Sequence, residues 1–573
     1  MIKIPTIYQW QKFPNVLNKK ERYFIIGITI LIIVSIFGWI IAHKFATTKI
    51  APNFGGSFTE GIIGSPQYLN PVLSQASDSD RDVTELIFSG LMKYNNKGEL
   101  IPDLAQEYKI GDNGKIYEFI LRNDIMWHDG EKFTADDVIF TINIIQNSDY
   151  RSPLKAGWSG VEIEKIDDYK IKFKLKTAYA PFLANTTTGI IAKHIWGKIT
   201  PVDFSLIPEN LNPVGTGPYK LTKIKKDNNG FVSYIKLEAF GNYDSDRRPF
   251  INEINLNFYP DEITAIKAYN RGQIDNLSII STKNISLIKG ENRSNVKKLI
   301  LPRYFAVFFN QSRSNVLSDK TVRQALNYAT NKKQIVEDVL NGNGETVDSP
   351  IPAGVWGHAE NLKIYDFAQE HAKNILEAAG WKDADNDGIR EKGIEKLEIE
   401  LITTDLKELQ RVANILQEQW LKIGVKTNIK ILDIGEVQQK YVRPREYQAL
   451  LFGEVLGADP DPFSFWHSTQ KKDPGLNLAI YNNVKVDALL KDARQILEPE
   501  LRLKKYAEFQ QLVIDDAPVV FLYSSYQIYL TAKNIKGFEN KNISLPSKRF
   551  IDIEKWYIKT QRIKKSFDGA KNE

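Results

Sequence analysis

The stretch WHDGEKFTADDV at residues 127–138 joins a tight turn to the start of a helix. Asp129 and Gly130 form a turn dipeptide, and Thr134 stands three residues before Asp137, which is the spacing of a capping box. Apolar residues then recur at helical spacing, at Val138, Ile142 and Ile145. We therefore expect an ordered turn that leads into a capped amphipathic helix.

Two segments after this stretch have the residue pattern of β-strands. In residues 171–175 apolar side chains alternate with lysines, and in residues 254–258 they alternate with asparagines. Alternation with a period of two predicts strands that are buried on one face. Residues 322–329 instead follow helical spacing behind a cap at Ser318 or Asp319.

A longer pattern lies in the C-terminal half. Residues 397–402 and 425–432 have strand-like patterns, and between them a helix is expected to carry Leu409, Val412, Leu416 and Trp420 on one face. This order is typical of a β-α-β unit. The fold class indicated by these patterns is mixed α/β.

The N-terminal side contains a different kind of segment. Residues 23–42 carry no charge over twenty positions, and a helix of that length spans about 30 Å, the thickness of a bilayer core. Lys12, Lys19, Lys20 and Arg22 precede it. The positive-inside rule therefore predicts a cytoplasmic N-terminus at residues 1–22 and an extracytoplasmic remainder.

A cleaved signal peptide is the main alternative for residues 23–42. Its apolar region is usually about 7–15 residues long and ends at small residues, whereas the flank here is AHKFATT at residues 42–48. We favour an uncleaved single-pass anchor in the cell membrane. Residues 43–57 are then expected to form a flexible tether, and residues 561–573 a polar tail.

Composition limits the classes of function. The 573 residues predict about three domains at roughly 100–200 residues each. The net charge of +6 arises from 76 basic and 70 acidic residues, an excess that is too thin and too dispersed to predict binding to nucleic acid. There is no cysteine, which excludes disulfides, thiolate metal sites and a lipid-modified cysteine anchor.

The motifs of common enzymes are missing. The sequence contains no G-x-S-x-G, H-E-x-x-H, Walker A or G-x-G-x-x-G pattern, and its six histidines are far apart. We expect neither an enzyme nor a cofactor.

One segment resembles the start of a calcium loop. Asp383, Asp385 and Asp387 alternate and precede Gly388, but the twelfth position is Ile394, where such a loop needs a glutamate. A polar surface turn is the preferred interpretation, and structural calcium stays the alternative.

Several motifs occur together in a fixed order. They are the opening stretch at residues 127–138, NPVGTGPY at residues 212–219, the segment DKTVRQALNYA at residues 319–329, DPDP at residues 459–462 and APVV at residues 517–520. Together they resemble the bacterial family-5 extracellular solute-binding proteins, which include oligopeptide, dipeptide and nickel binders. The resemblance runs from about Gly61 to Phe538.

The resemblance implies a two-lobed, three-domain periplasmic-binding-protein-like fold of the type II, large peptide-binding class. By position, the first domain is expected at residues 58–97, 212–303 and 520–560, the second at residues 98–211 and the third at residues 304–519. The lobes are expected to close on a ligand at their interface.

The resemblance also implies ligand-binding positions. Ala76, Ser77 and Asp78 are expected on the first-domain side of the cleft, and Gly453, Glu454 and Val455 on the opposite side, where they offer mainly backbone groups. Asp459 is the preferred partner of a peptide's α-ammonium, with Glu454 and Asp461 as rivals. An Asp-Pro turn without contact to ligand remains an equal interpretation of Asp459 and Asp461. Relatives often have a Gly-Trp pair where this chain has Gly453-Glu454, so a carboxylate replaces an aromatic side chain at this position.

The implied function is capture of peptides for an ABC importer. The expected partners are a peptide ligand, the ABC permease and its ATPase, and the membrane through the N-terminal helix; the protein itself is expected to be a monomer. Alternatives are another solute, such as a nickel complex or an oligosaccharide, and a sensory or scaffold ectodomain that has lost transport.

Overall fold

The computed structural model describes residues 6–241, 243, 247–289 and 293–565. The chain forms two compact units, one made of Met1–Gly55 with Tyr557–Glu573 and the other of Gly56–Trp556. The larger unit contains three main β-sheets and the helices that pack on them.

The first sheet has seven strands. Its order is β13 (Ser294–Leu299), β22 (Gln527–Ala532), β12 (Asn276–Ile280), β2 (Ser57–Ile63), β11 (Glu253–Tyr259), β10 (Val232–Ala239) and β9 (Tyr219–Lys226). Strand β2 runs parallel to β11 and β12. Helix α8 (Glu262–Asn270) contributes to a buried cluster with β12 and β22. Ile254 and Leu256 of β11 are fully buried, so the alternation seen in residues 254–258 is confirmed.

The second sheet is antiparallel and has four strands, β5 (Ala105–Gly111), β6 (Ile116–Leu121), β8 (Lys170–Leu175) and β7 (Val161–Asp167). Ile171 and Phe173 are fully buried. Lys172 and Lys174 lie on the opposite face, where they pair with Glu118 and Glu164 of neighbouring strands. The half-buried strand predicted at residues 171–175 is therefore confirmed. Short helices in the connections are α5 (Lys155–Trp158), α6 (Phe182–Asn185) and α7 (Lys193–Trp196).

The opening stretch forms the predicted turn and helix. Helix α4 (Ala135–Gln146) begins with a capping box, in which the amide of Thr134 donates to Asp137 Oδ2 at 3.0 Å. His128 lies in the turn, and its Nε2 donates to the carbonyl of Gly217 at 3.0 Å while its Nδ1 accepts from the amide of Gly215 at 3.3 Å. Burial lowers the pKa of His128 to about 4, so the ring is neutral. The turn is thus bonded to the NPVGTGPY segment.

Glycine is needed in that segment because it lies against backbone. A Cβ on Gly215 would lie 2.0 Å from the carbonyl oxygen of Ile87, the last residue of α3 (Asp78–Ile87). The amide of Gly217 donates to the same oxygen at 2.7 Å. These contacts join residues 128, 215–217 and 87 into one packed junction.

The third sheet has six strands in the order β15 (Gly344–Thr346), β21 (Val519–Ser525), β14 (Arg303–Phe309), β20 (Ala449–Val455), β18 (Glu398–Thr404) and β19 (Lys426–Leu432). Strands β18 and β19 are parallel and are joined by α13 (Lys407–Leu421). The predicted β-α-β unit is confirmed.

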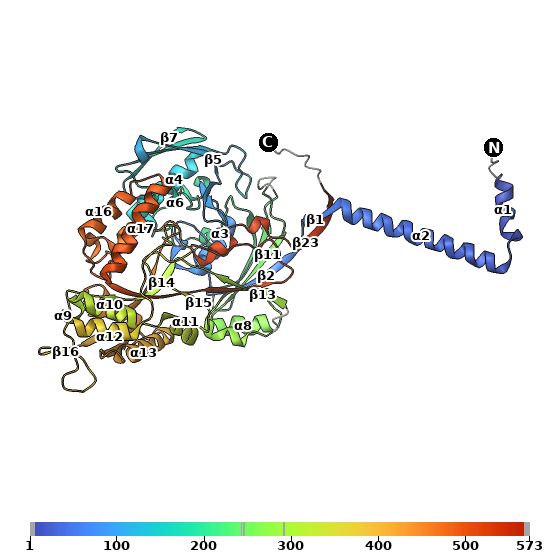
Figure 1. Cartoon of the computed structure of the whole chain (residues 1–573). Coiled ribbons are helices and arrows are strands. Elements are labelled where there is room, and N and C mark those ends of the chain that lie inside the picture. The colour runs from blue at the N-terminus through green and yellow to red at the C-terminus, as the bar shows by residue number, and fades with distance from the viewer. Residues whose placement is uncertain (1–5, 242, 244–246, 290–292, 566–573) are drawn as a thin grey trace. The chain divides into compact units, whose positions relative to one another are not determined.

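Helices cover both faces of the third sheet (Figure 1). One face packs against α10 (Lys320–Ala329), α11 (Lys332–Leu340), α12 (Gln369–Ala378) and α13. The other packs against α15 (Phe463–Trp466), α16 (Val484–Ala493) and α17 (Pro499–Asp516). Asp319 caps α10 by accepting from the amide of Thr321 at 2.9 Å. The remaining short elements are β3 (Met92–Tyr94), β4 (Leu100–Pro102), α9 (Asn315–Ser318), β16 (Glu391–Lys392), β17 (Glu395–Lys396) and α14 (Ile434–Glu436).

The pairing of strand β21 differs from the expected boundary between the third and first domains at residue 520. Residues 520–525 were expected in the first domain, but β21 pairs with β14 and β15 of the third sheet. The sheet change comes after Ser525, because β22 then pairs with β12 and β13. The division into three domains itself stays a prediction.

The smaller unit corrects two further expectations. Helix α2 (Lys19–Thr47) continues past residue 42, and β1 (Thr48–Asn53) pairs antiparallel with β23 (Lys559–Lys564). Residues 43–53 are therefore ordered in a helix and a strand instead of a flexible tether, and residues 561–564 belong to a strand. A two-stranded ladder satisfies backbone groups that a tether would leave to water. Residues 566–573 of the predicted tail lie outside the described residues.

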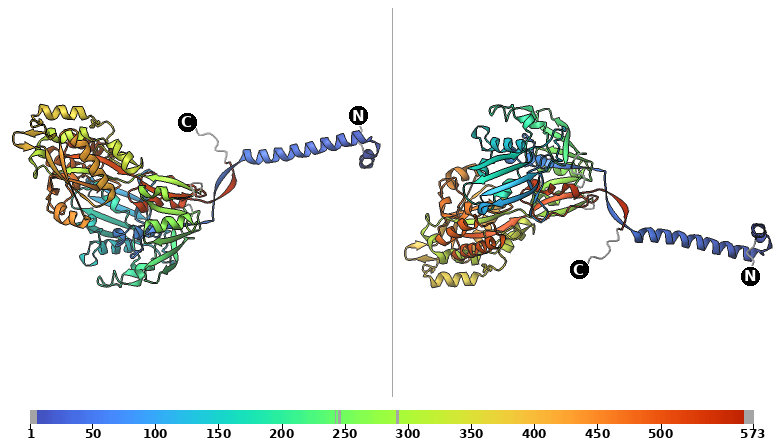
Figure 2. Two further views of the ribbon diagram at one scale, coloured as in Figure 1. Left: turned by 90° about the horizontal axis from the view of Figure 1, so that it is seen from below. Right: turned by 90° about the horizontal axis from the view of Figure 1, so that it is seen from above.

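Helix α2 matches the predicted membrane segment. It runs unbroken for 29 residues (Figure 2) and follows the shorter helix α1 (Ile7–Val16). Its side chains are exposed, and it is the one helix among the described residues that is long and apolar enough to cross a membrane.

Candidate functional site

The connections of the third sheet open a crevice between two parallel strands. After β18 the chain passes through α13 to β19 on one side, whereas after β20 it passes through α15, α16 and α17 to β21 on the other side. Strands β18 and β20 are adjacent and parallel. In open α/β sheets, ligands bind outside the carboxyl ends of strands at such a switch point.

A cavity of about 210 Å³ lies at these strand ends. We call it the switch-point crevice. It is lined by Arg303, Tyr304, Phe305, Thr404, Leu406, Leu409, Ile434, Phe452, Gly453, Glu454 and Val455. The three predicted positions Gly453, Glu454 and Val455 therefore lie together on its wall.

Strand β20 leaves backbone groups unpaired in this crevice. The amide of Leu456 donates to the carbonyl of Pro302 at 2.6 Å, so the alternation of an antiparallel ladder makes Tyr304 and Glu454 the next hydrogen-bonded pair. The amides and carbonyls of Gly453 and Val455 then point away from β14. On that side, within the described residues, β18 pairs only with Ala449 and Leu450. The edge of β20 is thus open at Gly453 and Val455.

Gly453 also has a packing role. A Cβ at this position would lie 2.9 Å from the ring of Phe305, which stacks on Tyr523. A side chain here would displace that ring. Val455 ends the strand with 61% of its surface exposed.

The Glu454 side chain is buried beside the crevice. It is 4% exposed, and its carboxyl accepts a hydrogen bond from the Tyr304 hydroxyl. Its other oxygen, Oε1, has no partner among the described residues. Burial raises the pKa of Glu454 to about 8, so the group is mostly protonated at neutral pH. A neutral carboxyl is a poor partner for an ammonium group.

Asp459 lies in the loop after β20 and is ion-paired. Both of its carboxylate oxygens accept from Arg502, at 2.7 and 2.8 Å, and the Arg502 side chain is only 5% exposed. Arg502 also donates to the Tyr506 hydroxyl at 2.9 Å. This bidentate pair favours the interpretation of Asp459 as part of a structural turn, while its role toward a ligand amine stays a prediction.

Asp461 has partners from two parts of the larger unit. It accepts from Arg494 at 2.6 Å and from the Tyr179 hydroxyl at 3.2 Å. Next to this contact, the amide of Ala180 donates to the carbonyl of Arg494 at 2.7 Å. The DPDP loop is therefore held where the predicted second and third domains meet.

The other predicted positions surround the N-terminus of α3. The Ser77 hydroxyl accepts from the amide of Asp80, and Asp78 pairs with Arg81. The Asp78 carboxylate also lies close enough to Arg303 to act on its pKa, which burial lowers. Asp78 is not among the residues that line the switch-point crevice, and Ala76 lines a separate cavity of about 1000 Å³ with Tyr68 and Tyr150.

Several residues that line the switch-point crevice were not predicted from the sequence. Arg303 is the first residue of β14, whereas Leu406 and Ile434 lie two residues after the ends of β18 and β19. A polar or exposed apolar residue at a strand end is a weak signal, and only the order of strands in the sheet shows which ends meet.

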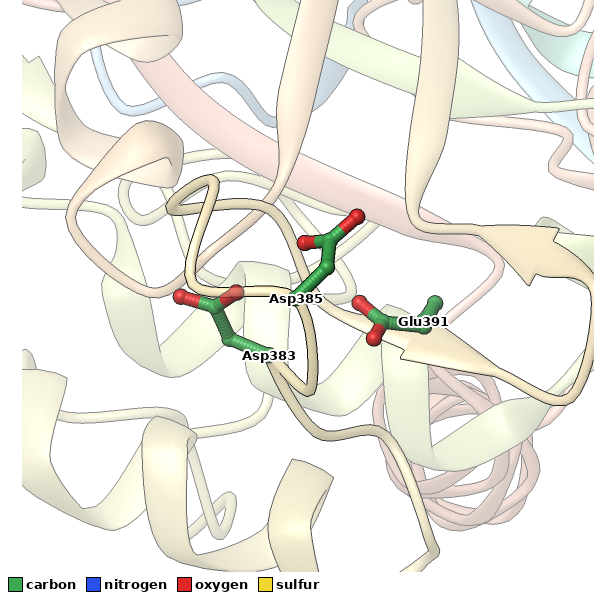
Figure 3. A group of neighbouring side chains, drawn as sticks. All are labelled: Asp383, Asp385 and Glu391. Atoms are coloured by element: carbon green, nitrogen blue, oxygen red, sulfur yellow. The ribbon is translucent and has the colours of Figure 1, made fainter.

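The acidic loop differs in detail from the predicted calcium arrangement (Figure 3). Oxygens of Asp383, Asp385 and Glu391 lie within 4.8 Å of one another, so Glu391 stands where Asp387 was expected. Lys396 pairs with Asp385 at 3.1 Å and also with Asp387. This cation neutralises part of the cluster, which favours the polar-turn interpretation.

Comparison with known proteins agrees with this geometry. The family model for bacterial extracellular solute-binding proteins, family 5, matches residues 99–475. The oligopeptide-binding protein AppA of Bacillus subtilis is 30% identical over 515 residues, which cover 88% of this chain and 92% of that protein.

Solved structures of other proteins are also similar to this chain. AppA of Bacillus subtilis in complex with a nonapeptide has a TM-score of 0.67 and 29% identity, covering 88% of this chain and 99% of that chain. NikZ of Campylobacter jejuni in complex with Ni(L-His) has a TM-score of 0.68 and 28% identity, covering 87% and 99%. The fold is therefore that of the type II periplasmic peptide-binding proteins. This chain belongs to the bacterial extracellular solute-binding proteins of family 5, and it is a binding protein of ABC transport instead of an enzyme.

Proposed function

We propose that this protein captures peptides outside the cell membrane and delivers them to an ABC permease and its ATPase. The observation that carries this proposal is the open edge of β20 at Gly453 and Val455. An extended peptide added there as a strand satisfies its backbone amides independently of its sequence.

The relatives support a peptide as the solute. The B. subtilis protein named above is an oligopeptide-binding protein whose solved complex holds a nonapeptide. A strand added to β20 also places alternate side chains on opposite sides of the peptide. Such side chains then enter pockets while the main chain supplies the common contacts.

Closure of two lobes is the proposed mechanism of capture. The Asp78 carboxylate acts electrostatically on Arg303 of the third sheet, and Ala76 and Ser77 lie in the same segment as Asp78. Ligand contacts to both sides favour the closed state, which shifts the population toward a shape that the permease recognises. We propose that the protein does this as a monomer. Asp459 stays the predicted partner for the α-ammonium of the peptide, and its pair with Arg502 gives the structural alternative.

Helix α2 is the proposed membrane anchor. It is followed at once by β1, and the flank at residues 42–48 lacks a pattern of small residues for cleavage. Mass spectrometry of the protein extracted from the membrane fraction tests this. An intact mass that includes residues 1–47 agrees with an anchor, and a mature chain that starts after residue 42 contradicts it.

Identification of the co-purified solute tests the function as a whole. Native mass spectrometry of the full chain in detergent should show a mixture of peptides released on unfolding. Oligosaccharide or metal complexes in their place would contradict the proposal. The absence of permease and ATPase genes beside this gene would favour a sensory or scaffold ectodomain.

A nickel complex is the second candidate, because NikZ is similar over 87% of this chain. Nickel favours imidazole ligands, but the lining of the switch-point crevice includes no histidine among the described residues. This difference favours peptide over nickel.

A further inference from the structure

Arg303 is a cation without an anionic partner in the switch-point crevice. Its Nη2 donates to the Ser525 hydroxyl at 3.1 Å and, more weakly, to the Ser525 carbonyl at 3.5 Å. Its Nε is buried and has no hydrogen-bond partner within the described part of the chain. In the same residues, no carboxylate lies within 4.0 Å of the guanidinium group. A partly buried charge of this kind is costly unless something pairs with it.

The nearest carboxylates are already engaged. Asp78 pairs with Arg81, and Glu408 accepts from the Tyr523 hydroxyl at 2.8 Å. Both act on Arg303 electrostatically, but neither supplies the missing hydrogen bonds. Nη1 of Arg303 also has no hydrogen-bond partner among the described residues and, unlike Nε, is not enclosed, so it remains as a donor on a residue that lines the cavity.

The rest of that cavity is mostly apolar. Leu406, Leu409, Ile434 and Phe452 line it together with Phe305 and Val455. Its volume is about 210 Å³, and an apolar cavity of about 150 Å³ is large enough to hold benzene. The crevice thus has space for one aliphatic or aromatic side chain, and not for a whole drug-sized ligand.

We propose that the switch-point crevice binds a peptide residue whose apolar side chain fills the cavity and that Arg303 holds a carboxylate beside it. The proposal rests on the proposed function, because β20 must first align the peptide main chain. A carboxylate of this kind comes from two sources, the C-terminus of the peptide or an acidic side chain next to the apolar residue. Charge-assisted pairing with the planar guanidinium suits both.

Competitive retention by the full chain tests this proposal. The detergent-solubilised protein is immobilised and exposed to nonapeptides with randomised sequences, half with a free C-terminus and half amidated. Mass spectrometry then measures the retained ratio. We expect the free acid to be retained about 10- to 100-fold over the amide, the effect of one charge-assisted hydrogen-bonded pair.

Single substitutions separate the contribution of Arg303 to peptide retention from that of the apolar lining. Arg303→Gln should abolish the preference, Arg303→Lys should keep part of it, and Arg313→Gln, which changes an exposed arginine paired with Glu446, should leave it unchanged. Ile434→Ser, at a side chain that is 42% exposed, should instead reduce enrichment of apolar residues next to the carboxylate. Each variant is checked by its melting temperature before use.

The outcomes distinguish the sources and the two proposals. Enrichment of Asp or Glu among retained amidated peptides, lost in Arg303→Gln, assigns the carboxylate to a side chain. The role of Arg303 is overturned if the wild type and Arg303→Gln show both the same acid-to-amide ratio and the same content of Asp and Glu in the retained peptides. Retention of no peptide by the wild type contradicts the proposed function itself.

Discussion

Two arginines of the larger unit, one buried and one partly buried, differ in what surrounds them. Arg549, 1% exposed, donates to both oxygens of Asp82 at 2.7 Å and to Glu60 at 3.1 Å. Arg303 lines the switch-point crevice and has only Ser525 as a hydrogen-bond partner among the described residues. The first cluster joins β2, α3 and the segment near residue 549, and so stabilises the fold. Arg303, in contrast, has hydrogen-bond donors that remain for a solute.

The two arginines differ in whether their hydrogen bonds are satisfied within the protein, and this difference indicates their roles. A group whose hydrogen bonds are satisfied within the protein contributes to specificity of folding, whereas a group with unused donors in a cavity indicates a missing anion. Arg502 belongs with Arg549, because Asp459 and Tyr506 satisfy it.

The largest effect is expected for Arg549→Met. The change leaves Glu60 and Asp82, which are 0% and 2% exposed, without a cation. Removing one partner of a buried ion pair costs about 3–5 kcal/mol of unfolding free energy. Urea denaturation measures the loss, and a change no larger than that of the exposed control Arg313→Gln would show that the cluster is not structural.

Asp459→Asn should have a somewhat smaller effect on stability. Arg502 would lose its bidentate partner, although the Asp459 side chain is 20% exposed and water replaces part of the contact. We expect a loss of about 2–3 kcal/mol in urea denaturation. If stability is unchanged and peptide affinity instead falls about tenfold, Asp459 holds the ligand amine and does not belong with the structural pairs.

Glu454→Gln tests the neutral carboxyl beside the crevice through pH. The folded-state pKa of Glu454 is raised to about 8 from an ordinary value of 4.5, with burial as the cause. Between these values the folded protein binds one proton more than the unfolded chain, so stability falls as pH rises through this range. The wild type should lose about 2 kcal/mol relative to Glu454→Gln between pH 6 and pH 8. Parallel pH profiles of the two proteins would show that Glu454 is ionised in the fold.

Arg303→Gln should hardly change stability, since no ion pair is broken. We expect a change in unfolding free energy of less than about 1 kcal/mol, because the variant removes a poorly satisfied charge. A loss comparable to that of Arg549→Met would remove the distinction between the two arginines and would place Arg303 among the structural charges.

The smallest effect is expected at the acidic loop. Asp383 and Asp385 are exposed, Glu391 is half-buried, and Lys396 pairs with Asp385. Addition of calcium or of a chelator should give no measurable change in melting temperature. A clear rise with calcium would show that the loop binds the ion and that Lys396 moves aside.

Features with local signals were predictable from the sequence. The capping box at Thr134 and Asp137, the alternation at residues 171–175 and the β-α-β unit around α13 depend on neighbouring residues, and the structure confirms each one. Order of the motifs along the chain identified the family.

Features that depend on distant pairing were not predictable. Strand β1 pairs with β23 from the other end of the chain, and β21 returns to the third sheet from the range assigned to the first domain. Arg502 satisfies Asp459 from 43 residues away. The importance of Arg303 follows only from the position of β14 beside β20, because a lone arginine before an apolar strand is a common sequence.

Hydrogen–deuterium exchange of β20 tests the central claim most directly. In the protein without peptide, the amide of Glu454 is paired with β14, whereas the amides of Gly453 and Val455 face the open edge. Addition of peptide should slow exchange at Gly453 and Val455 and leave Glu454 nearly unchanged. Unaltered exchange at both open amides, under conditions where peptide is bound, would contradict binding of the peptide as an added strand.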